Sequence, residues 1–323
     1  MSFTFFKKAA AFVMLMSAAF AAQGQDYPSK MVKIVVSYPP GGGADIMARL
    51  IAQKLTTSLG QTFVVENKPG ASGQIASQSV AKAAPDGYTL MVDASSYAVN
   101  PSLFPKLPYD TQTAFAPVTL LARFPNMLVV SPDFPVTSVK ELVAMAKAKP
   151  GSLSYASSGN GSAQHLAGEL FKQQAGVNLQ HVAYKGGGPA LNDVVAGHVP
   201  IFFANMASGL GQVKAGKLKA LASTGARRSA NMPDLPTMAE AGVPGYEVYE
   251  WNVLVAPAGT PVAIINKLQA EVKKVLEMKD VRERIDSLGG EVVASSPAET
   301  STFLKGQIEK WAKVVKAGDI KVD

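Results

Sequence analysis

The sequence predicts an α/β protein of two domains, each a mostly parallel sheet flanked by helices. Strand-like and helix-like segments alternate from Met31 onward, and this order is typical of parallel, doubly wound sheets. The chain has 323 residues, of which 47% are hydrophobic and 17% charged, which is enough for two domains with substantial cores. Two apolar stretches, 117–130 and 246–256, are expected to cross between the domains.

Residues 1–21 are expected to form a Sec signal peptide rather than part of the fold. Lys7 and Lys8 precede an apolar run from Ala9 to Phe20, and small residues follow it. This pattern is typical of a secretion signal, and the apolar run is too short to span a bilayer. The chain contains no cysteine, so no disulfide or cysteine-linked lipid is expected. We therefore expect a periplasmic protein without a stable membrane anchor.

The charge balance is mildly basic. Lysine and arginine number 31 against 24 acidic residues; without the two leader lysines the balance is 29 − 24 = +5. The basic residues are spread along the chain and lack the aromatic-interleaved clusters of nucleic-acid-binding proteins. A mild positive balance favours a small anionic ligand.

The first domain is expected to open with a βαβαβ unit. Residues 33–38 are apolar and β-branched and predict a buried strand. After the glycine turn at 41–43, an amphipathic helix is expected from about Ala44. The elements that follow are a strand at 62–66, a helix at 72–83, a strand at 88–92 and irregular, proline-rich chain at 97–117.

The second domain is expected to repeat the alternation before the chain returns to the first. The predicted helices are 139–148, 162–174, 189–196 and 210–215, and the predicted strands are 153–156, 179–184, 199–203 and 218–223. Helices are then expected at 261–276, 280–288 and 297–317. The expected domains are 26–125 plus 252–323, and 126–251.

Four loops that lead from a strand to a helix are candidates for an anion site: 39–45, 69–73, 157–165 and 185–189. Each is glycine-rich or built of small residues. Glycine lets the backbone approach a ligand, and the first-turn N–H groups of a helix have no partner within it. In open α/β sheets, ligands bind at such loops. The alternative for each loop is an ordinary turn that uses glycine for its geometry.

Single residues in these loops also have structural alternatives. The hydroxyls of Ser158 and Ser162 suit helix capping, and Asp45 is expected to cap the helix that follows the first loop. His165 can touch a ligand, whereas His181, in a strand, and His198, in a turn, suit structural roles. Trp251 on the return crossing either lines the cleft or packs in the core.

Enzyme motifs are absent from the sequence. There is no G-x-S-x-G and no H-E-x-x-H. The dinucleotide pattern at 159–164 lacks its third glycine, because Gln164 stands there. Residues 211–217 are spaced like a phosphate loop, but Leu218 replaces the hydroxyl that binds magnesium. We therefore expect no enzyme activity, no cofactor and no metal.

Several long motifs resemble one family. They are YPPGGGADIMARLIAQKL, VVENKPGASGQIASQSVAKAAPDGYTL, LSYASSGNGSAQHLAGELF, HVAYKGGGPALNDVVAGHVPIFF, and LPTMAEAGVPGYEVYEW followed by LVAPAGTP. Together they resemble the substrate-binding receptors of tripartite tricarboxylate transporters, the Bug receptors. The resemblance implies a periplasmic binding protein of type II-like, two-domain α/β fold that closes on a small organic carboxylate. We expect a monomer that delivers this ligand to the membrane subunits of a tripartite tricarboxylate-type transporter.

In that family, the loops that correspond to 39–45, 69–73 and 157–162 hold the ligand's carboxylate, largely through backbone N–H groups and bound water. Two positions depart from the family pattern, because Ala183 replaces a common proline and Ala204 stands where an aspartate is usual. The candidate ligand-binding residues are Tyr38, Gly41, Gly42, Gly43, Ala44, Asp45, Ala71, Ser72, Gly73, Ser95, Ser158, Gly159, Asn160, Gly161, Ser162, His165, Tyr184, Lys185, Gly186, Ala204, Asn205 and Trp251.

Two other functions share parts of this pattern. A binding protein that passes its ligand signal to a sensor would use the same pocket residues, and an exported α/β hydrolase would need a nucleophile–base pair that the motifs do not supply.

The ligand is expected to lack an α-ammonium group, because a buried ammonium needs an acidic partner. Asp93 and Glu250 are the remaining acidic candidates and are expected to be less well placed.

Overall fold

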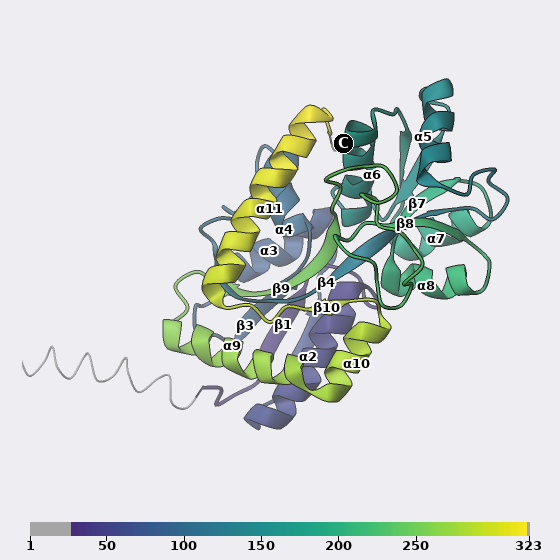
Figure 1. Cartoon of the computed structure of the whole chain (residues 1–323). Helices are drawn as coiled ribbons and strands as arrows, with labels where there is room; N and C mark the ends of the chain where they lie inside the picture. The colour runs from purple at the N-terminus through teal and green to yellow at the C-terminus, as the bar shows by residue number, and fades with distance from the viewer. Residues whose placement is uncertain (1–26, 322–323) are drawn as a thin grey trace, which may run out of the picture.

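The structure, a computed structural model, describes residues 27–321, so the expected signal peptide lies outside the described residues. One mixed sheet runs through the molecule, with helices on both faces (Figure 1). The predicted α/β class is confirmed. In the described part of the chain, every helix is too short or too polar to serve as a membrane span.

The N-terminal block forms the predicted βαβαβ unit. Its elements are β1 (Val32–Val36), α2 (Gly43–Leu59), β2 (Phe63–Asn67), the 3₁₀ turn η1 (Ala71–Gly73), α3 (Gln74–Ala81) and β3 (Thr89–Asp93). β1 lies between β2 and β3 and is parallel to both, with Ile34 opposite Val65 and Leu90. Because the three strands are parallel, the carboxyl ends of β1, β2 and β3 lie at the same end of the sheet.

The sequence-based expectation of irregular chain at 97–117 is wrong in two places. α4 (Ser96–Leu103) is helical despite Pro101, and β4 (Phe115–Val130) begins inside the stretch. Ala98, Val99 and Leu103 of α4 are buried in the core cluster that also contains Leu304 and Val315 of α11 (Pro297–Ala317). Burial against α11 therefore outweighs the loss of a helical hydrogen bond at proline.

Two long antiparallel strands join the halves of the sheet. β4 is one continuous strand, and β9 (Tyr249–Pro257) pairs along it. β9 also pairs with β3, and β4 pairs with β7 (Ile201–Asn205). These two strands are the crossings that the sequence predicts at 117–130 and 246–256.

The other half of the sheet follows the predicted alternation. Its elements are α5 (Val139–Ala148), β5 (Ser154–Ser157), α6 (Ala163–Ala175), β6 (Gln180–Ala183), α7 (Gly187–Val195), β7, α8 (Met206–Lys214) and β8 (Lys219–Ser223). β5 is parallel to β6 and β7, whereas β7 and β8 are antiparallel to β4.

The register along β4 shows where the two halves meet. β3 ends at Asp93, opposite Val253, and Val253 pairs with Leu120 of β4. β7 runs in the opposite direction and ends at Asn205, opposite Asn126 of β4. The carboxyl ends of the two sets of parallel strands therefore face each other across the short stretch of β4 from Leu120 to Asn126.

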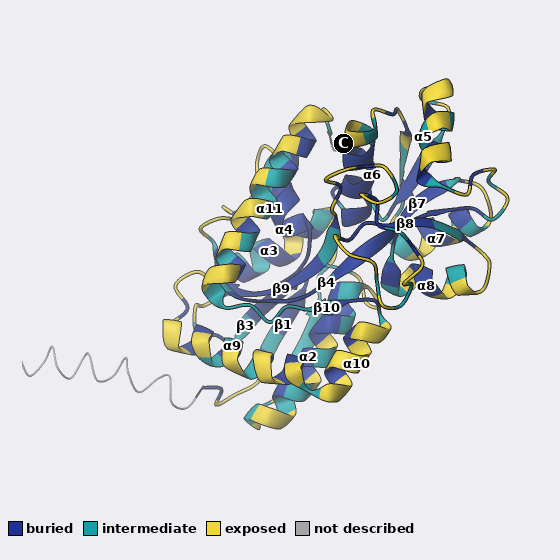
Figure 2. Ribbon diagram, viewed as in Figure 1, coloured by how far each residue is buried: buried dark blue, intermediate teal, exposed yellow. Residues whose placement is uncertain are grey.

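The C-terminal helices cover both faces of the first half of the sheet, which contains β1, β2 and β3. α9 (Val262–Glu277) and α10 (Lys279–Ser287) pack with α2 over one core, whereas α11 packs with α3 and α4 over another (Figure 1). A two-residue strand, β10 (Glu291–Val292), adds to β4 and was not expected from the sequence. The central strands β3, β4, β7 and β9 are mostly buried, and many exposed residues lie on the outer faces of the helices (Figure 2).

Candidate functional site

The first loop is held in shape by Asp45. Gly41 has φ = 84°, Gly42 is the N-cap of α2, and Gly43 and Ala44 begin the helix. The Asp45 carboxylate accepts hydrogen bonds from the Gly41 N–H (2.9 Å) and from Arg49 Nε (3.0 Å). Burial opposes its ionisation, but these hydrogen bonds outweigh burial and lower the pKa of Asp45. Asp45 therefore fixes the loop. The N-cap of α2 is Gly42, and no side chain caps this end of the helix, so the expectation that Asp45 caps it is wrong.

The second loop carries backbone strain. The φ angles of Gly70, Ala71, Ser72 and Gly73 are all positive, at 117°, 46°, 52° and 83°. Non-glycine residues adopt this conformation rarely, and strain of this kind gathers at functional sites. Asn100 Nδ2 donates to the Ser72 carbonyl (2.8 Å) and holds the loop in place.

A buried serine–aspartate cluster lies under these two loops. Asp93 Oδ1 accepts hydrogen bonds from Ser37 Oγ (2.5 Å) and Ser96 Oγ (2.7 Å), and the Tyr38 hydroxyl donates to Ser96 Oγ (3.0 Å). Burial raises the pKa of Asp93. Ser95, the N-cap of α4, is buried beside this cluster. The Tyr38 hydroxyl is thus held by the buried cluster through Ser96. Ser37 and Ser96 were not among the candidate residues from the sequence.

The third loop uses a histidine as a backbone clamp. His165 Nδ1 accepts a hydrogen bond from the Gly161 N–H (3.1 Å), and the His165 ring stacks on His181 with 3.9 Å between ring centroids. Burial lowers the pKa of His165 to about 4 and that of His181 to about 3. Both rings are therefore neutral at pH 7. His165 as a ligand contact stays a prediction; its ring is largely buried and its Nδ1 is taken by the Gly161 N–H.

The remaining residues of this loop lie at the start of α6. Ser162 is the N-cap, and its Oγ accepts from the His165 N–H (3.3 Å). Gly159 has φ = 125°, Asn160 is half-buried, and Ser158 Oγ donates to Gln164 Oε1 (2.6 Å). Ser158 therefore orients Gln164, a site residue that sequence reasoning treated only as a missing glycine.

The fourth loop supports the third rather than the centre of the site. The Gly186 N–H donates to the Ser158 carbonyl (3.1 Å). The Tyr184 hydroxyl donates to Asp193 Oδ2 (2.6 Å) on α7. Lys185 is exposed. The Tyr184 hydroxyl thus points to α7, the helix that follows this loop, and Tyr184 as a ligand contact stays a prediction.

Glu250 connects the two halves at the centre. It lies on β9 opposite Phe124, within the stretch of β4 where the two sets of strand ends face each other. Glu250 Oε2 accepts from Asn205 Nδ2 (2.9 Å) and Gln164 Nε2 (3.2 Å). A Cβ added at Gly43 would lie 2.8 Å from Glu250 Oε1, so the start of α2 lies against the same carboxylate. The sequence predicted a poorly placed acidic residue at Glu250, whereas the structure places it between the starts of α2 and α6.

Trp251 and Ala204 belong to the core rather than to the site. Successive side chains of a strand point to opposite faces, so Trp251 faces away from Glu250. Trp251 is 1% exposed, and its ring packs edge-on against Phe303 of α11, with 5.4 Å between centroids. Ala204 is fully buried with Met127 and Met206. Asn205, the next residue, caps α8 and reaches Glu250.

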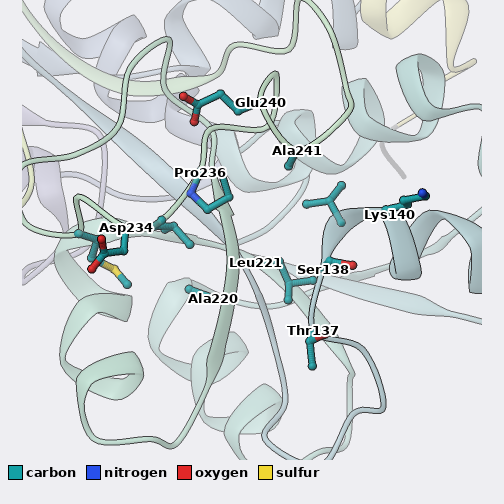
Figure 3. Close-up of a pocket in the computed structure, with 12 residues that line it drawn as sticks. Thr137, Ser138, Lys140, Ala220, Leu221, Asp234, Pro236, Glu240 and Ala241 are labelled. Carbon is teal, nitrogen blue, oxygen red and sulfur yellow. The ribbon is translucent and has the colours of Figure 1, made fainter.

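A separate surface hollow of about 460 Å³ lies on the other half of the molecule (Figure 3). It is bordered by Ser138 and Lys140 at the start of α5 and by Leu221 of β8. Asp234 and Glu240 lie on its opposite side, on the chain that follows β8. None of the candidate ligand-binding residues lines it, so it is distinct from the site at Glu250.

The fold and the site define a class of protein. Two α/β halves, joined by two crossing strands, direct the starts of α2 and α6 toward one place between them. This is the architecture of a periplasmic binding protein, and the solved structures similar to this chain include a periplasmic binding protein called BugD.

Residues 47–320 match the family described as tripartite tricarboxylate transporter family receptor, and this chain belongs to that family. It is 37% identical over 313 residues to the protein BugT of Bordetella pertussis, and the aligned region covers 96% of each chain. A solved structure of Rpa4515 from R. palustris with adipate has 39% identity and a TM-score of 0.86, covering 92% of this chain and 99% of that one. MatC of Rhodopseudomonas palustris with bound malate has 35% identity and a TM-score of 0.82, covering 90% of this chain and 100% of that one.

Proposed function

We propose that this chain is a periplasmic solute-binding receptor that captures a small organic carboxylate between the two halves of its sheet. The observation that supports this most strongly is the meeting of the α2 and α6 N-termini at Glu250, one helix from each half. Helix N-termini present unpaired N–H groups and the positive ends of helix dipoles, and so favour an anion. Such a site holds an anion without a reactive group, so we infer binding without catalysis.

The ligand class is inferred from the relatives and from the loops. Rpa4515 and MatC were solved with adipate and malate, both small organic carboxylates. In this chain, Gly42 lies exposed at the start of α2, and Asn160 and Ser162 are half-buried at the start of α6. Backbone N–H groups, amides and hydroxyls suit a carboxylate because each donates a charge-assisted hydrogen bond to it.

The proposed domains are 26–125 plus 252–323, and 126–251. Their boundaries fall in β4 and β9, the two strands that join the halves of the sheet. In this proposal the two strands act as the hinge, and the ligand favours the closed arrangement because it contacts both halves.

The proposed route of the protein follows from its N-terminus and its family. Residues 1–21 direct export, and the mature monomer passes its ligand to the membrane subunits of a tripartite tricarboxylate-type transporter. N-terminal sequencing of exported protein should start between residues 22 and 25. Recovery of the uncleaved chain in the inner membrane would contradict this part of the proposal.

Calorimetry with two variants of Gly42 tests the binding site. Gly42 has φ = −78°, which proline adopts, so Gly42→Pro removes one N–H without straining φ. Gly42→Ala keeps the N–H, and its Cβ would make only an ordinary contact of 3.6 Å with the Pro39 carbonyl. Loss of one charge-assisted bond should weaken carboxylate binding about tenfold or more in Gly42→Pro, and Gly42→Ala should bind like the wild type. Equal affinity in both variants would place the anion site elsewhere.

A further inference from the structure

Glu250 is an acidic side chain at the centre of the proposed ligand site. Its Oε2 is held by two neutral amides, Asn205 Nδ2 at 2.9 Å and Gln164 Nε2 at 3.2 Å. Within residues 27–321, Oε1 accepts no hydrogen bond, and it lies against Gly43, where an added Cβ would be 2.8 Å away. One oxygen is therefore fixed by the protein, and the other faces the start of α2 without a donor.

The charge of Glu250 also lacks a cation. Among the described residues, Glu250 forms no ion pair, whereas the nearby Asp45 is paired with Arg49. Burial raises the pKa of Glu250, and the two amide hydrogen bonds only partly oppose that effect. A carboxylate that is half-buried and held only by neutral donors favours any group that brings it a proton or a positive charge.

A ligand carboxylate at the start of α2 brings a second negative charge close to Glu250. Two carboxylates in one partly buried site disfavour each other. A hydroxyl or ammonium group on the ligand, next to its carboxylate, would instead donate to Oε1. We propose that Glu250 is a specificity-determining residue that accepts a hydrogen bond from such a group, so that the receptor favours hydroxy or amino acids over plain dicarboxylates.

This inference rests on the proposed function and changes one expectation drawn from the sequence. The expected exclusion of α-ammonium ligands depended on Glu250 being poorly placed. The structure puts Glu250 between the α2 and α6 N-termini, so that premise does not hold.

The test uses three ligands with the same four-carbon chain, namely succinate, malate and aspartate, which carry hydrogen, hydroxyl and ammonium at carbon 2. Calorimetry compares the wild type with Glu250→Gln. The amide oxygen of the glutamine is expected to stay with the donors of Asn205 and Gln164, so its NH₂ replaces the acceptor that faces the ligand. The wild type should bind malate or aspartate at least about tenfold more tightly than succinate. In Glu250→Gln this ratio should fall about tenfold or more, with the greater loss for aspartate if ammonium is the preferred donor.

Glu247→Gln is the matched control, because Glu247 is exposed three residues earlier and the substitution is the same. Its binding ratios should equal those of the wild type. If Glu250→Gln fails to fold, Glu250→Asp withdraws the carboxylate from Gly43 and should lower the same ratios. Binding of succinate, with no preference for a donor-bearing ligand or with the same preference in Glu250→Gln, overturns the role of Glu250 and leaves the receptor function standing. If the wild type binds none of the three ligands nor adipate, the proposed function fails, and the role of Glu250 with it.

Discussion

His165 should make the protein lose stability as the pH falls from 7 to 5. His165 is 3% exposed, and its Nδ1 accepts a hydrogen bond from the Gly161 N–H at 3.1 Å. Burial, with a smaller effect of Lys172, lowers the pKa of His165 to about 4 in the folded protein, against about 6.5 in an unfolded chain. Below pH 6.5 the unfolded chain therefore takes up a proton that the folded protein does not, which favours unfolding down to about pH 4.

Each pH unit between the two pKa values is worth about 1.4 kcal/mol, so His165 should account for a loss of about 2 kcal/mol between pH 7 and pH 5. The assay is urea unfolding at both pH values for the wild type and for His165→Asn. Asparagine offers an oxygen to the Gly161 N–H but does not titrate. The variant should lose about 2 kcal/mol less than the wild type over this range. Equal losses in the two proteins would show that His165 is not the source of this pH dependence.

Three further predictions concern the loops and the core. Gly73→Ala should destabilise more than Gly60→Ala in urea unfolding: both glycines have positive φ, but a Cβ at Gly73 would lie 3.1 Å from Ser96 Oγ, while one at Gly60 meets nothing within 4 Å. We expect Gly60→Ala to lower the free energy of unfolding by about 1 kcal/mol and Gly73→Ala to lower it by at least about 1 kcal/mol more. Equal losses would argue against close packing at Gly73. Ser162→Ala removes the N-cap of α6 and should cost about 1 kcal/mol, against a few tenths for Ser162→Gly; a thermal melt in which the two variants match would contradict the cap. Trp251→Phe should lower the free energy of unfolding by about 1–3 kcal/mol and leave carboxylate affinity unchanged in calorimetry, whereas a tenfold loss of affinity would return Trp251 to the ligand site.

Most of the fold could be predicted from the sequence, because hydrophobic patterning and glycine turns act over a few residues. The helices at 139–148 and 297–317 have the predicted ends. α4 and β10 could not be predicted in this way, since α4 depends on burial against α11 and β10 on pairing with β4. Both are consequences of contacts between distant parts of the chain.

The candidate site was predictable as a set of loops but not as a set of contacts. Glycine at 41–43 and at 159–161 located the turns. The sequence could not show that the N–H of Gly41 is taken by Asp45 and that of Gly161 by His165. These bonds leave the next N–H groups, at the starts of α2 and α6, as the candidate donors.

Glu250 was underrated for a related reason. Strand alternation separates Glu250 from Trp251, but the sequence does not say which of the two faces the site. That choice depends on the register of β9 with β4, where Glu250 lies opposite Phe124 between the ends of β3 and β7. Pairing over more than a hundred residues of sequence therefore decides which side chain faces the proposed site.

The most direct test of the central claim is an amide NMR titration of the ¹⁵N-labelled mature protein with malate. Carboxylate binding at the two helix N-termini should give the largest shift changes at Gly42, Gly43 and Ala44 at the start of α2 and at Ala163 and Gln164 at the start of α6, because these N–H groups are the proposed donors. The largest changes at residues around the hollow of Figure 3, or at no residue of either helix start, would contradict it.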